Sequence, residues 1–302
     1  MEKTAFLFAG QGAQSVGMGK DFCEENEAAR AVFAMGERLA PGITALCFAG
    51  DSTELNRTEN TQPALFLTDL AIAAALRAAG VSADGAAGFS LGEIPALAFA
   101  EVLSEEEAFR FVLLRGKSMA AAAARHAGGM AAALKLPPEQ VEEICRRFRE
   151  IWPVNYNCPG QVSCAGSAAE IDDFCAAVKA AGGRAVKLPV SGAFHTPYME
   201  EAAPALREFL AGAALAAPAI PVYANRTGEP YPADPAEITA LLCGQVFSPV
   251  LFEKTLHRMW EDGYRRFIEV GAGSTLSGFV RRTLPDAVSV TVNNVAAMAA
   301  LN

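Results

Sequence analysis

The chain has 302 residues, of which 52% are hydrophobic and 20% charged, and its formal net charge at pH 7 is −9. This length predicts about two domains, and the acidic balance argues against a general nucleic-acid binder, which needs a basic surface. The seven cysteines form no Cys-x-x-Cys pair, which indicates reduced thiols in a cytoplasm and not a disulfide framework or a zinc site. No signal peptide and no run of about 18 apolar residues is found, so we expect no membrane span.

A strand is predicted at residues 4–8, and it leads into the glycine-rich segment AGQGAQSVGMGK. This segment does not fit a nucleotide-binding loop, because the third glycine of the dinucleotide pattern would fall on Ser15 and Lys20 lacks the preceding Walker glycines. A strand followed by such a loop can instead present backbone N–H groups to a developing negative charge. We therefore expect an anion-stabilising loop here.

The segment GFSLG contains a candidate nucleophile, Ser90, and follows a buried helix predicted over 63–79 with its start at Pro63. The pattern Gly-x-Ser-x-Gly is typical of a strand that turns sharply at the serine and enters a helix. Glycines are needed at positions 88 and 92 because the turn leaves no room for a Cβ atom. A chain with 26 glycines can contain this pattern by chance, so a general base is required as independent support.

A long helix is predicted from the Ser104 and Glu107 capping box to about residue 125. Its apolar stripe includes Val112 and Met119, and Arg115 occupies a position on the same stripe. A buried arginine is costly unless an anion meets it. The helix alone leaves two interpretations equally open, an arginine that binds an anionic ligand and one whose head reaches a structural carboxylate.

Residues 129–190 are predicted to form a β-α-β-β-α-β unit, the ferredoxin-like arrangement. Its second helix is expected to be capped by Ser167 and Glu170 and to end at the glycines 182 and 183. The expected strands are 130–136, 154–157, 162–165 and 184–190, with the first helix over 137–150.

After this unit, strand-like segments alternate with helical ones, as in a mostly parallel α/β sheet. The expected strands are 221–225, 265–270 and 288–293. We therefore predict an α/β fold in which a large domain, residues 1–127 and 192–302, carries an insert at 128–191.

Three histidines could serve as a general base for Ser90. His126 follows the end of a helix, where a cation suits the helix dipole, and His257 stands among charged residues on a polar helix face. His195 lies in a loop just after the last strand of the insert, the placement expected of a catalytic residue. By elimination His195 is the candidate base, with a lone structural histidine as the alternative. No metal site is expected, because no two histidines have ligand spacing.

Seven motifs follow one another along the chain, namely FAGQGAQ, GFSLGE, RGKSM, VNYNCPGQ, VSGAFHTPYM, QVFSPVLF and EVGAGSTLSGFVRR. This ordered set resembles the malonyl-CoA:acyl-carrier-protein transacylases over nearly the whole chain. The resemblance implies an α/β-hydrolase-like large domain with a ferredoxin-like insert. It also implies ping-pong transfer of malonyl from CoA to the phosphopantetheine thiol of acyl carrier protein, with no cofactor.

The resemblance implies roles for single residues. Ser90 would carry the acyl group, and His195 would be its base. The backbone N–H groups of Gln11 and Leu91 would form the oxyanion hole, as in other nucleophile elbows. In this family the residue before the nucleophile is usually histidine, whereas this chain has Phe89, which cannot supply a hydrogen bond.

Further residues would bind substrate. Arg115 would pair with the free carboxylate of malonyl, and Asn155 matches a position that lines the site. Gln245 lies in the segment whose backbone carbonyl orients the histidine in place of a triad acid. The sequence GAFH, which ends at His195, resembles the malonyl-type form of this segment.

Acyl carrier proteins of this type are acidic, so an acidic enzyme must meet them with a local basic patch. Lys187, Arg281 and Arg282 are the candidates for this patch. We expect a cytoplasmic monomer that binds malonyl-CoA and acyl carrier protein and neither nucleic acid nor membrane. Three alternatives stay open, namely an acyltransferase that serves a polyketide assembly line, a thioester hydrolase of similar build, and a non-catalytic docking module.

Overall fold

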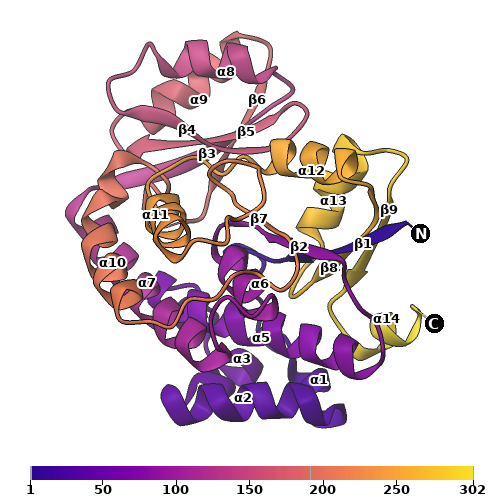
Figure 1. The fold of residues 1–302 in the computed structure, drawn as a ribbon. Coiled ribbons are helices and arrows are strands. Elements are labelled where there is room, and N and C mark those ends of the chain that lie inside the picture. Colours follow the sequence, from indigo (N-terminus) through magenta and orange to yellow (C-terminus); the bar gives the residue numbers. More distant parts are fainter. Residues whose placement is uncertain (1, 191, 302) are drawn as a thin grey trace.

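The computed structural model describes residues 2–190 and 192–301, and it contains two separate β-sheets surrounded by helices (Figure 1). The first sheet has five strands, all parallel, in the order β7-β2-β1-β8-β9. Its strands are β1 (Lys3–Phe8), β2 (Gly85–Gly88), β7 (Val222–Tyr223), β8 (Tyr264–Val270) and β9 (Val288–Val292). The predicted mixed α/β fold with a parallel sheet is confirmed.

The three central strands of this sheet end at the same level. Phe8, the last residue of β1, stands opposite Gly88 on one side and Val270 on the other. The loops that follow β1, β2 and β8 therefore meet at one edge of the sheet. The carboxyl edge of a parallel sheet is where ligands bind in open α/β folds.

The helix α5 (Thr58–Ala78) lies in the core, with most of its residues buried. The prediction that this helix starts at Pro63 is wrong, because helical structure begins five residues earlier, at Thr58. A proline inside a helix removes a hydrogen bond. Here α5 packs against α2 (Glu27–Leu39) and α7 (Glu105–Arg125), and this tertiary packing outweighs the local cost.

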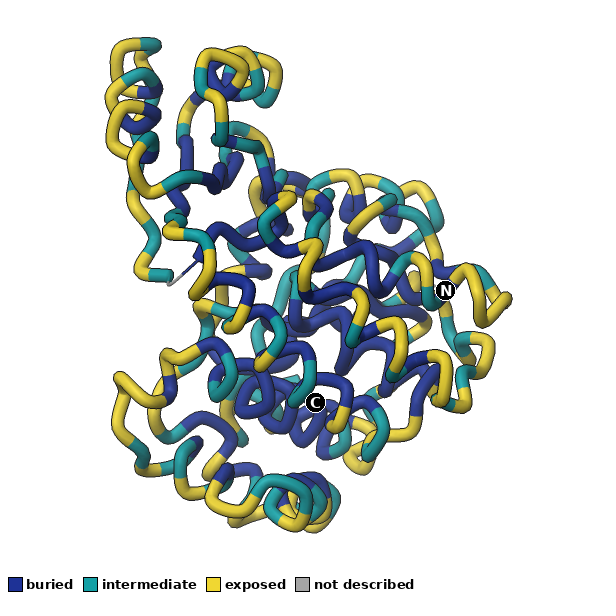
Figure 2. Tube along the Cα trace, turned by 90° about the vertical axis from the view of Figure 1, so that its left-hand side faces the viewer, coloured by how far each residue is buried: buried dark blue, intermediate teal, exposed yellow. Residues whose placement is uncertain are grey.

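The remaining helices of the described chain, two of them short 3-10 segments, cover the two sheets (Figure 1). The buried segments lie in the centre of the molecule, and the exposed ones follow its outer turns (Figure 2). These helices are α1 (Lys20–Glu25), α3 (Ile43–Ala49), α4 (Ser52–Leu55), η1 (Ser90–Gly92), α6 (Glu93–Phe99), α8 (Pro138–Cys145), α9 (Ile171–Ala180), η2 (Pro197–Ala202), α10 (Ala203–Ala211), α11 (Pro235–Gln245), α12 (Phe252–Glu261), α13 (Thr275–Thr283) and α14 (Val295–Ala299). None of the helices in the described part of the chain combines the length and apolar character needed to cross a membrane.

The second sheet is antiparallel and has the order β4-β5-β3-β6. Its helices α8 and α9 lie on the outer side, away from the parallel sheet (Figure 1). The strands are β3 (Gly128–Leu134), β4 (Ile151–Cys158), β5 (Gln161–Ser167) and β6 (Arg184–Leu188). The β-α-β-β-α-β element order predicted from the sequence is present. The predicted domain boundary at residue 191 falls on a residue outside those described.

The predicted cap of α9 by Ser167 and Glu170 is wrong. Glu170 is the N-cap residue, but no side chain caps this helix. Its carboxylate accepts hydrogen bonds from the backbone N–H groups of Arg149 and Glu150 instead. The carboxylate thus fixes the turn that leads into β4, a long-range use that the local Ser-x-x-Glu pattern does not reveal.

Candidate active site

Ser90 stands at the sharp turn between β2 and α6, and its backbone has a φ of 52°, in the left-handed region. A Cβ atom on Gly88 would collide with the backbone of Gly92, and one on Gly92 would collide with the carbonyl of Phe8. The two glycines are therefore required by the close approach of the backbone. The strand–turn–helix geometry predicted for this motif is present, and it holds the serine side chain at the sheet edge.

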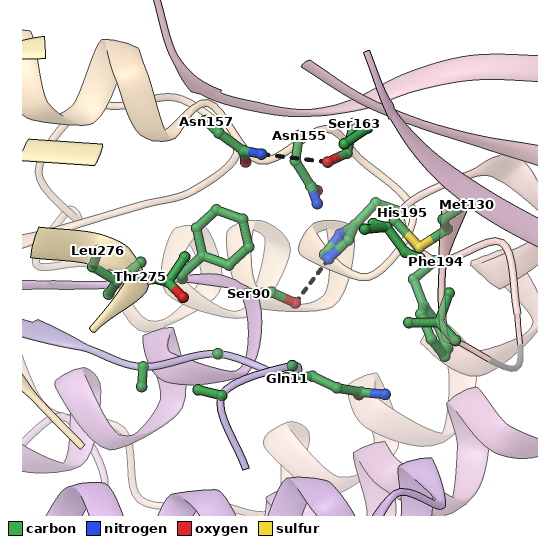
Figure 3. A pocket seen from close by; sticks show the side chains of 18 of the residues that line it. Gln11, Ser90, Met130, Asn155, Asn157, Ser163, Phe194, His195, Thr275 and Leu276 are labelled. Carbon is green, nitrogen blue, oxygen red and sulfur yellow. Dashed lines mark hydrogen bonds between the residues drawn. The ribbon is translucent and has the colours of Figure 1, made fainter. Parts of the chain in front are cut away.

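His195 faces Ser90 across the turn, with its Nε2 atom 2.8 Å from the serine Oγ (Figure 3). Its Nδ1 atom lies 3.0 Å from the backbone carbonyl oxygen of Gln245. Because a carbonyl only accepts hydrogen bonds, Nδ1 carries the proton and Nε2 is left to accept the serine hydroxyl. The carbonyl of Gln245 thus orients the imidazole as a triad acid does.

The His195 side chain is buried, and burial lowers its pKa to about 4. The positive charge of Arg115 acts in the same direction, and hydrogen bonding to the carbonyl of Gln245 opposes it. The imidazole is therefore neutral at neutral pH, which is the form that can accept a proton.

Arg115, on α7, is only 1% exposed and lies close to Ser90. Its guanidinium donates to the side-chain oxygens of Gln62 at 2.7 Å and Gln245 at 2.8 Å, and it lies 3.5 Å from Ser90 Oγ. Burial lowers the pKa of Arg115 to about 10, so the group remains charged at neutral pH. Within the described chain, no carboxylate forms an ion pair with it. The structural-carboxylate interpretation is therefore not supported.

A network of buried polar side chains stabilises the backbone turn at Ser90. Asn225 accepts the backbone N–H of Ser90 at 2.6 Å and donates to the carbonyl of Gly88 at 2.6 Å. The Gln245 side chain donates to the carbonyl of Ser90 at 2.7 Å and to the Glu93 carboxylate at 3.0 Å. Gln245 was expected to help bind substrate, but its side-chain amide already forms hydrogen bonds with other residues of the protein.

No role was predicted from the sequence for Glu93, Asn225 or Gln62. Glu93 is buried, accepts from the Tyr231 hydroxyl and the backbone N–H of Asn225, and has a pKa raised by burial. A signal for it existed, because Glu93 is the single charged residue in the apolar helix segment EIPALAF. No comparable signal marks Asn225 or Gln62, because amides at strand ends and in helices are common.

Phe89 lines the cavity beside Ser90 and belongs to an aromatic group, with ring centres 5.4 Å from Phe252 and 6.0 Å from Phe279. At this position, where the resemblance implies a histidine, the chain thus has a residue that packs against other aromatic rings. The polar support of Arg115 comes from Gln62 and Gln245, so it does not depend on position 89.

The cavity lies between the loops of the parallel sheet and the inner face of the second sheet. Gln11 and Asn155 line it from opposite sides (Figure 3), and Leu91, the residue that follows Ser90, is buried. The Gln11 side chain donates to the Thr58 hydroxyl at 3.3 Å. Within the described residues, no cluster of side chains could hold a metal ion.

The candidate docking residues do not share one face. Leu188 lines the cavity, so the neighbouring Lys187 points to the opposite face of its strand, where it pairs with Asp172 on α9. Arg281 and Arg282 are exposed in the last turn of α13. Arg282 donates to the side chain of Gln161 at 2.9 Å.

The two other histidines lie outside the site. His126 stacks on Tyr198 with ring centres 4.5 Å apart and contacts the Glu201 carboxylate at 3.2 Å. His257 is exposed on α12. Of the three histidines, only His195 forms a hydrogen bond with Ser90 among the described residues.

Comparison with known proteins identifies the class of protein to which this fold and site belong. The family model described as "Acyl transferase domain" matches residues 5–300. The chain therefore belongs to the acyl transferase domain family.

Individual relatives specify the particular enzyme within this family. The chain is 37% identical to the malonyl CoA-acyl carrier protein transacylase of Bacillus subtilis (strain 168), over 93% of this chain and 90% of that protein. The crystal structure of the transacylase from Clostridium perfringens has 38% identity and a TM-score of 0.94, and the match covers 99% of this chain and 96% of that one. A malonyl-transacylase solved in complex with a type II PKS acyl-carrier protein has 33% identity, a TM-score of 0.95 and 98% coverage of both chains. Within its family, the chain thus groups with the malonyl CoA-acyl carrier protein transacylases.

Proposed function

We propose that this chain transfers a malonyl group from malonyl-CoA to the phosphopantetheine thiol of acyl carrier protein, through a malonyl ester on Ser90. The observation that carries this proposal is the position of Ser90 Oγ. It lies 2.8 Å from a neutral imidazole and 3.5 Å from a buried guanidinium. A base and a cation at one nucleophile fit an acyl group that ends in a carboxylate.

In the first half-reaction, His195 Nε2 accepts the proton of the Ser90 hydroxyl as Oγ attacks the thioester carbonyl. The resulting oxyanion is stabilised by the backbone N–H groups of Gln11 and Leu91, which come from two different strand ends. The C–S bond then breaks, and the departing CoA sulfur takes the proton from His195. The product is malonyl-Ser90 and free CoA.

The second half-reaction uses the same groups in reverse. His195 accepts the proton of the carrier-protein thiol, and the sulfur attacks the ester carbonyl of malonyl-Ser90. The C–O bond breaks, and Ser90 recovers its proton from His195. Both thiols are substrates, so the chemistry requires no cofactor.

Arg115 selects the acyl group in this proposal. Its two terminal nitrogens are held by Gln62 and Gln245, and its Nε–H has no partner among the described residues. A planar guanidinium with an open donor suits a carboxylate. Gln245 acts as a positioning residue for Arg115 and His195, and Asn155 contacts the bound substrate from the opposite wall.

We further propose that residues 1–127 and 192–302 form an α/β-hydrolase-like domain and that residues 128–191 form a ferredoxin-like insert. The parallel sheet with a nucleophile turn after β2 supports the first assignment. The antiparallel order β4-β5-β3-β6, with α8 and α9 covering one face, supports the second.

The carrier protein docks beside α13 in this proposal, because Leu276 and Phe279 of that helix line the cavity and Arg281 and Arg282 are exposed at its end. Lys187 contributes less, since it pairs with Asp172. We also propose a cytoplasmic monomer. The carrier belongs to fatty-acid synthesis by default, and a polyketide carrier is the second candidate, favoured by the solved relative in complex with such a protein.

Intact-protein mass spectrometry after mixing with malonyl-CoA tests the proposal. We expect a malonyl adduct on the enzyme that disappears when holo acyl carrier protein is added, with malonyl appearing on the carrier. Rapid release of free malonate without carrier would indicate a hydrolase. If neither adduct nor malonate formed, the docking-module alternative would hold.

A further inference from the structure

Glu93, the first residue of α6, is a buried carboxylate that no step of the proposed reaction uses. Three groups donate hydrogen bonds to it, namely the Tyr231 hydroxyl, the Gln245 side-chain amide and the backbone N–H of Asn225, the last two at 3.0 Å each. Burial raises the pKa of Glu93, whereas these hydrogen bonds and the positive charge of Arg115 lower it. A carboxyl group that only accepts hydrogen bonds from its partners is in its ionised form.

Gln245 connects this carboxylate with the guanidinium of Arg115. Its Nε2 donates to Glu93, and its Oε1 accepts from Arg115 Nη2 at 2.8 Å. Arg115 is the only lysine or arginine among the buried side chains that the structure describes. Burial lowers the pKa of Arg115, and the negative charge of Glu93 opposes this effect. The two opposite charges therefore compensate each other across one amide group.

The indirect contact leaves the guanidinium available to a ligand. A carboxylate in direct contact would occupy the paired donors that suit an acyl carboxylate. In this structure the two terminal nitrogens of Arg115 meet neutral amide oxygens of Gln62 and Gln245, and its Nε has no partner among the described residues. An arginine without any counter-charge, in turn, would be costly to bury. A carboxylate held one amide away meets both requirements.

We propose that Glu93 limits the strength with which Arg115 holds the carboxylate of the acyl group, and thereby sets the selectivity for malonyl. This inference rests on the proposed function. The ionised Glu93 repels a carboxylate bound at Arg115 and reduces the net positive charge that attracts it. Glu93 is thus a positioning residue, which acts on the acyl group through Gln245 and Arg115 and not by contact. Tyr231 contributes by donating to the ionised carboxylate.

The test is Glu93→Gln, which removes the charge and keeps the size of the side chain. Its amide oxygen can accept from Asn225 and Gln245, and its NH2 group can donate to the Tyr231 oxygen, so the network stays paired. The quantity measured is the ratio of kcat/KM for loading Ser90 with malonyl-CoA to that with acetyl-CoA. We expect this ratio to rise by about threefold to thirtyfold, as for one unit charge acting over roughly 10 Å at an effective dielectric constant of about 20.

Tyr231→Phe is the matched control, because it removes one donor of the same network and leaves the carboxylate charge in place. The ratio should be unchanged in this variant. An unchanged or lower ratio in Glu93→Gln would overturn the inference, since loss of a merely structural residue does not favour the anionic acyl group. An equal rise in both variants would also overturn it, because the charge would then not be the cause.

A second variant moves the charge instead of removing it, and it serves as the test if Glu93→Gln does not fold. Glu93→Gln combined with Gln245→Glu keeps one carboxylate in the network and places it directly against Arg115. The ratio should fall by about tenfold or more, because this carboxylate competes with the acyl carboxylate for the guanidinium. A ratio at or above that of the intact enzyme would contradict the inference. Failure of the proposed function is distinguishable, because the intact enzyme would then not load malonyl on Ser90.

Discussion

The two walls of the cavity differ in how completely their polar groups are paired. On the wall formed by the parallel sheet, the catalytic wall, Ser90, His195 and Gln245 bond to one another or to their neighbours before any substrate is present. On the wall formed by the second sheet, the side-chain oxygens of Asn155 and Asn157 have no hydrogen-bond partner among the residues that the structure describes. The difference teaches that the groups proposed to react are preorganised, whereas the amides of the opposite wall keep free hydrogen-bonding capacity.

Apart from loss of Ser90 itself, loss of the proposed base should have the largest effect of the substitutions on the catalytic wall. We expect His195→Ala to reduce the rate of malonyl loading by about 10²–10⁴-fold, because general-base assistance is removed. The matched variant His126→Ala, in which the histidine contacts Glu201 and Tyr198, should load at nearly the normal rate. Rapid-quench measurement of the acyl-enzyme checks both. Equal losses in the two variants would contradict the assignment.

Unlike the other polar groups of the catalytic wall named above, Arg115 has an unused hydrogen-bond donor. Its Nε–H has no acceptor among the described residues. Arg115→Ala should lower the preference for malonyl-CoA over acetyl-CoA by about 10²-fold or more, because the buried cation that meets the carboxylate is gone. Arg115→Lys should keep part of the preference, since an ammonium cannot make the paired contact. Parallel loading assays with both thioesters measure the ratio. A ratio unchanged in Arg115→Ala would make this arginine purely structural.

The pH profile of loading should report the buried imidazole. Because burial lowers the pKa of His195 to about 4, the neutral base persists well below the ordinary histidine value. We expect kcat/KM for malonyl-CoA to stay level down to about pH 5 and to fall roughly tenfold per pH unit below about pH 4. Stopped assays on pre-equilibrated enzyme give the profile. An inflection near 6.5, the unperturbed value, would show that the base is solvated.

The smallest expected effect concerns the outer surface. Arg281→Glu should raise the KM for acyl carrier protein a few-fold and leave malonyl loading unchanged, because rim charges act on encounter. Lys187→Glu should have a smaller effect, since Lys187 pairs with Asp172 on the outer face of the second sheet. Steady-state transfer at varied carrier concentration distinguishes the two. A larger effect of Lys187→Glu would indicate that the carrier protein docks on the outer face of the second sheet.

Local patterns predicted the parts of the site that depend on backbone shape. The turn at Ser90 needs glycines where Cβ atoms would collide, and the Ser104–Glu107 capping box forms as expected, because both depend on residues close in sequence. The start of α5 at Thr58 was missed, because packing on all sides tolerates Pro63 inside the helix.

Local sequence patterns could not predict the contacts between segments that are distant along the chain. The bond from Ser90 to Asn225 joins residues 135 positions apart, and the bonds of Gln245 join three segments. Such pairs are set by how the sheets and helices pack, and amide residues give no periodic signal that would reveal them. The partner of Arg115 stayed open for the same reason, since Gln62 lies on another helix.

The central claim is that Ser90 on the catalytic wall carries the acyl group, and two serines of the same cavity test it directly. Ser90 and Ser163 both line the cavity, one on each wall. Malonyl-CoA is mixed with the intact enzyme, Ser90→Ala and Ser163→Ala, and the adduct is located by peptide mass spectrometry. We expect the adduct on Ser90 in the intact enzyme and in Ser163→Ala, and none in Ser90→Ala. A malonyl group attached to Ser163, or an adduct that persists in Ser90→Ala, would contradict the account.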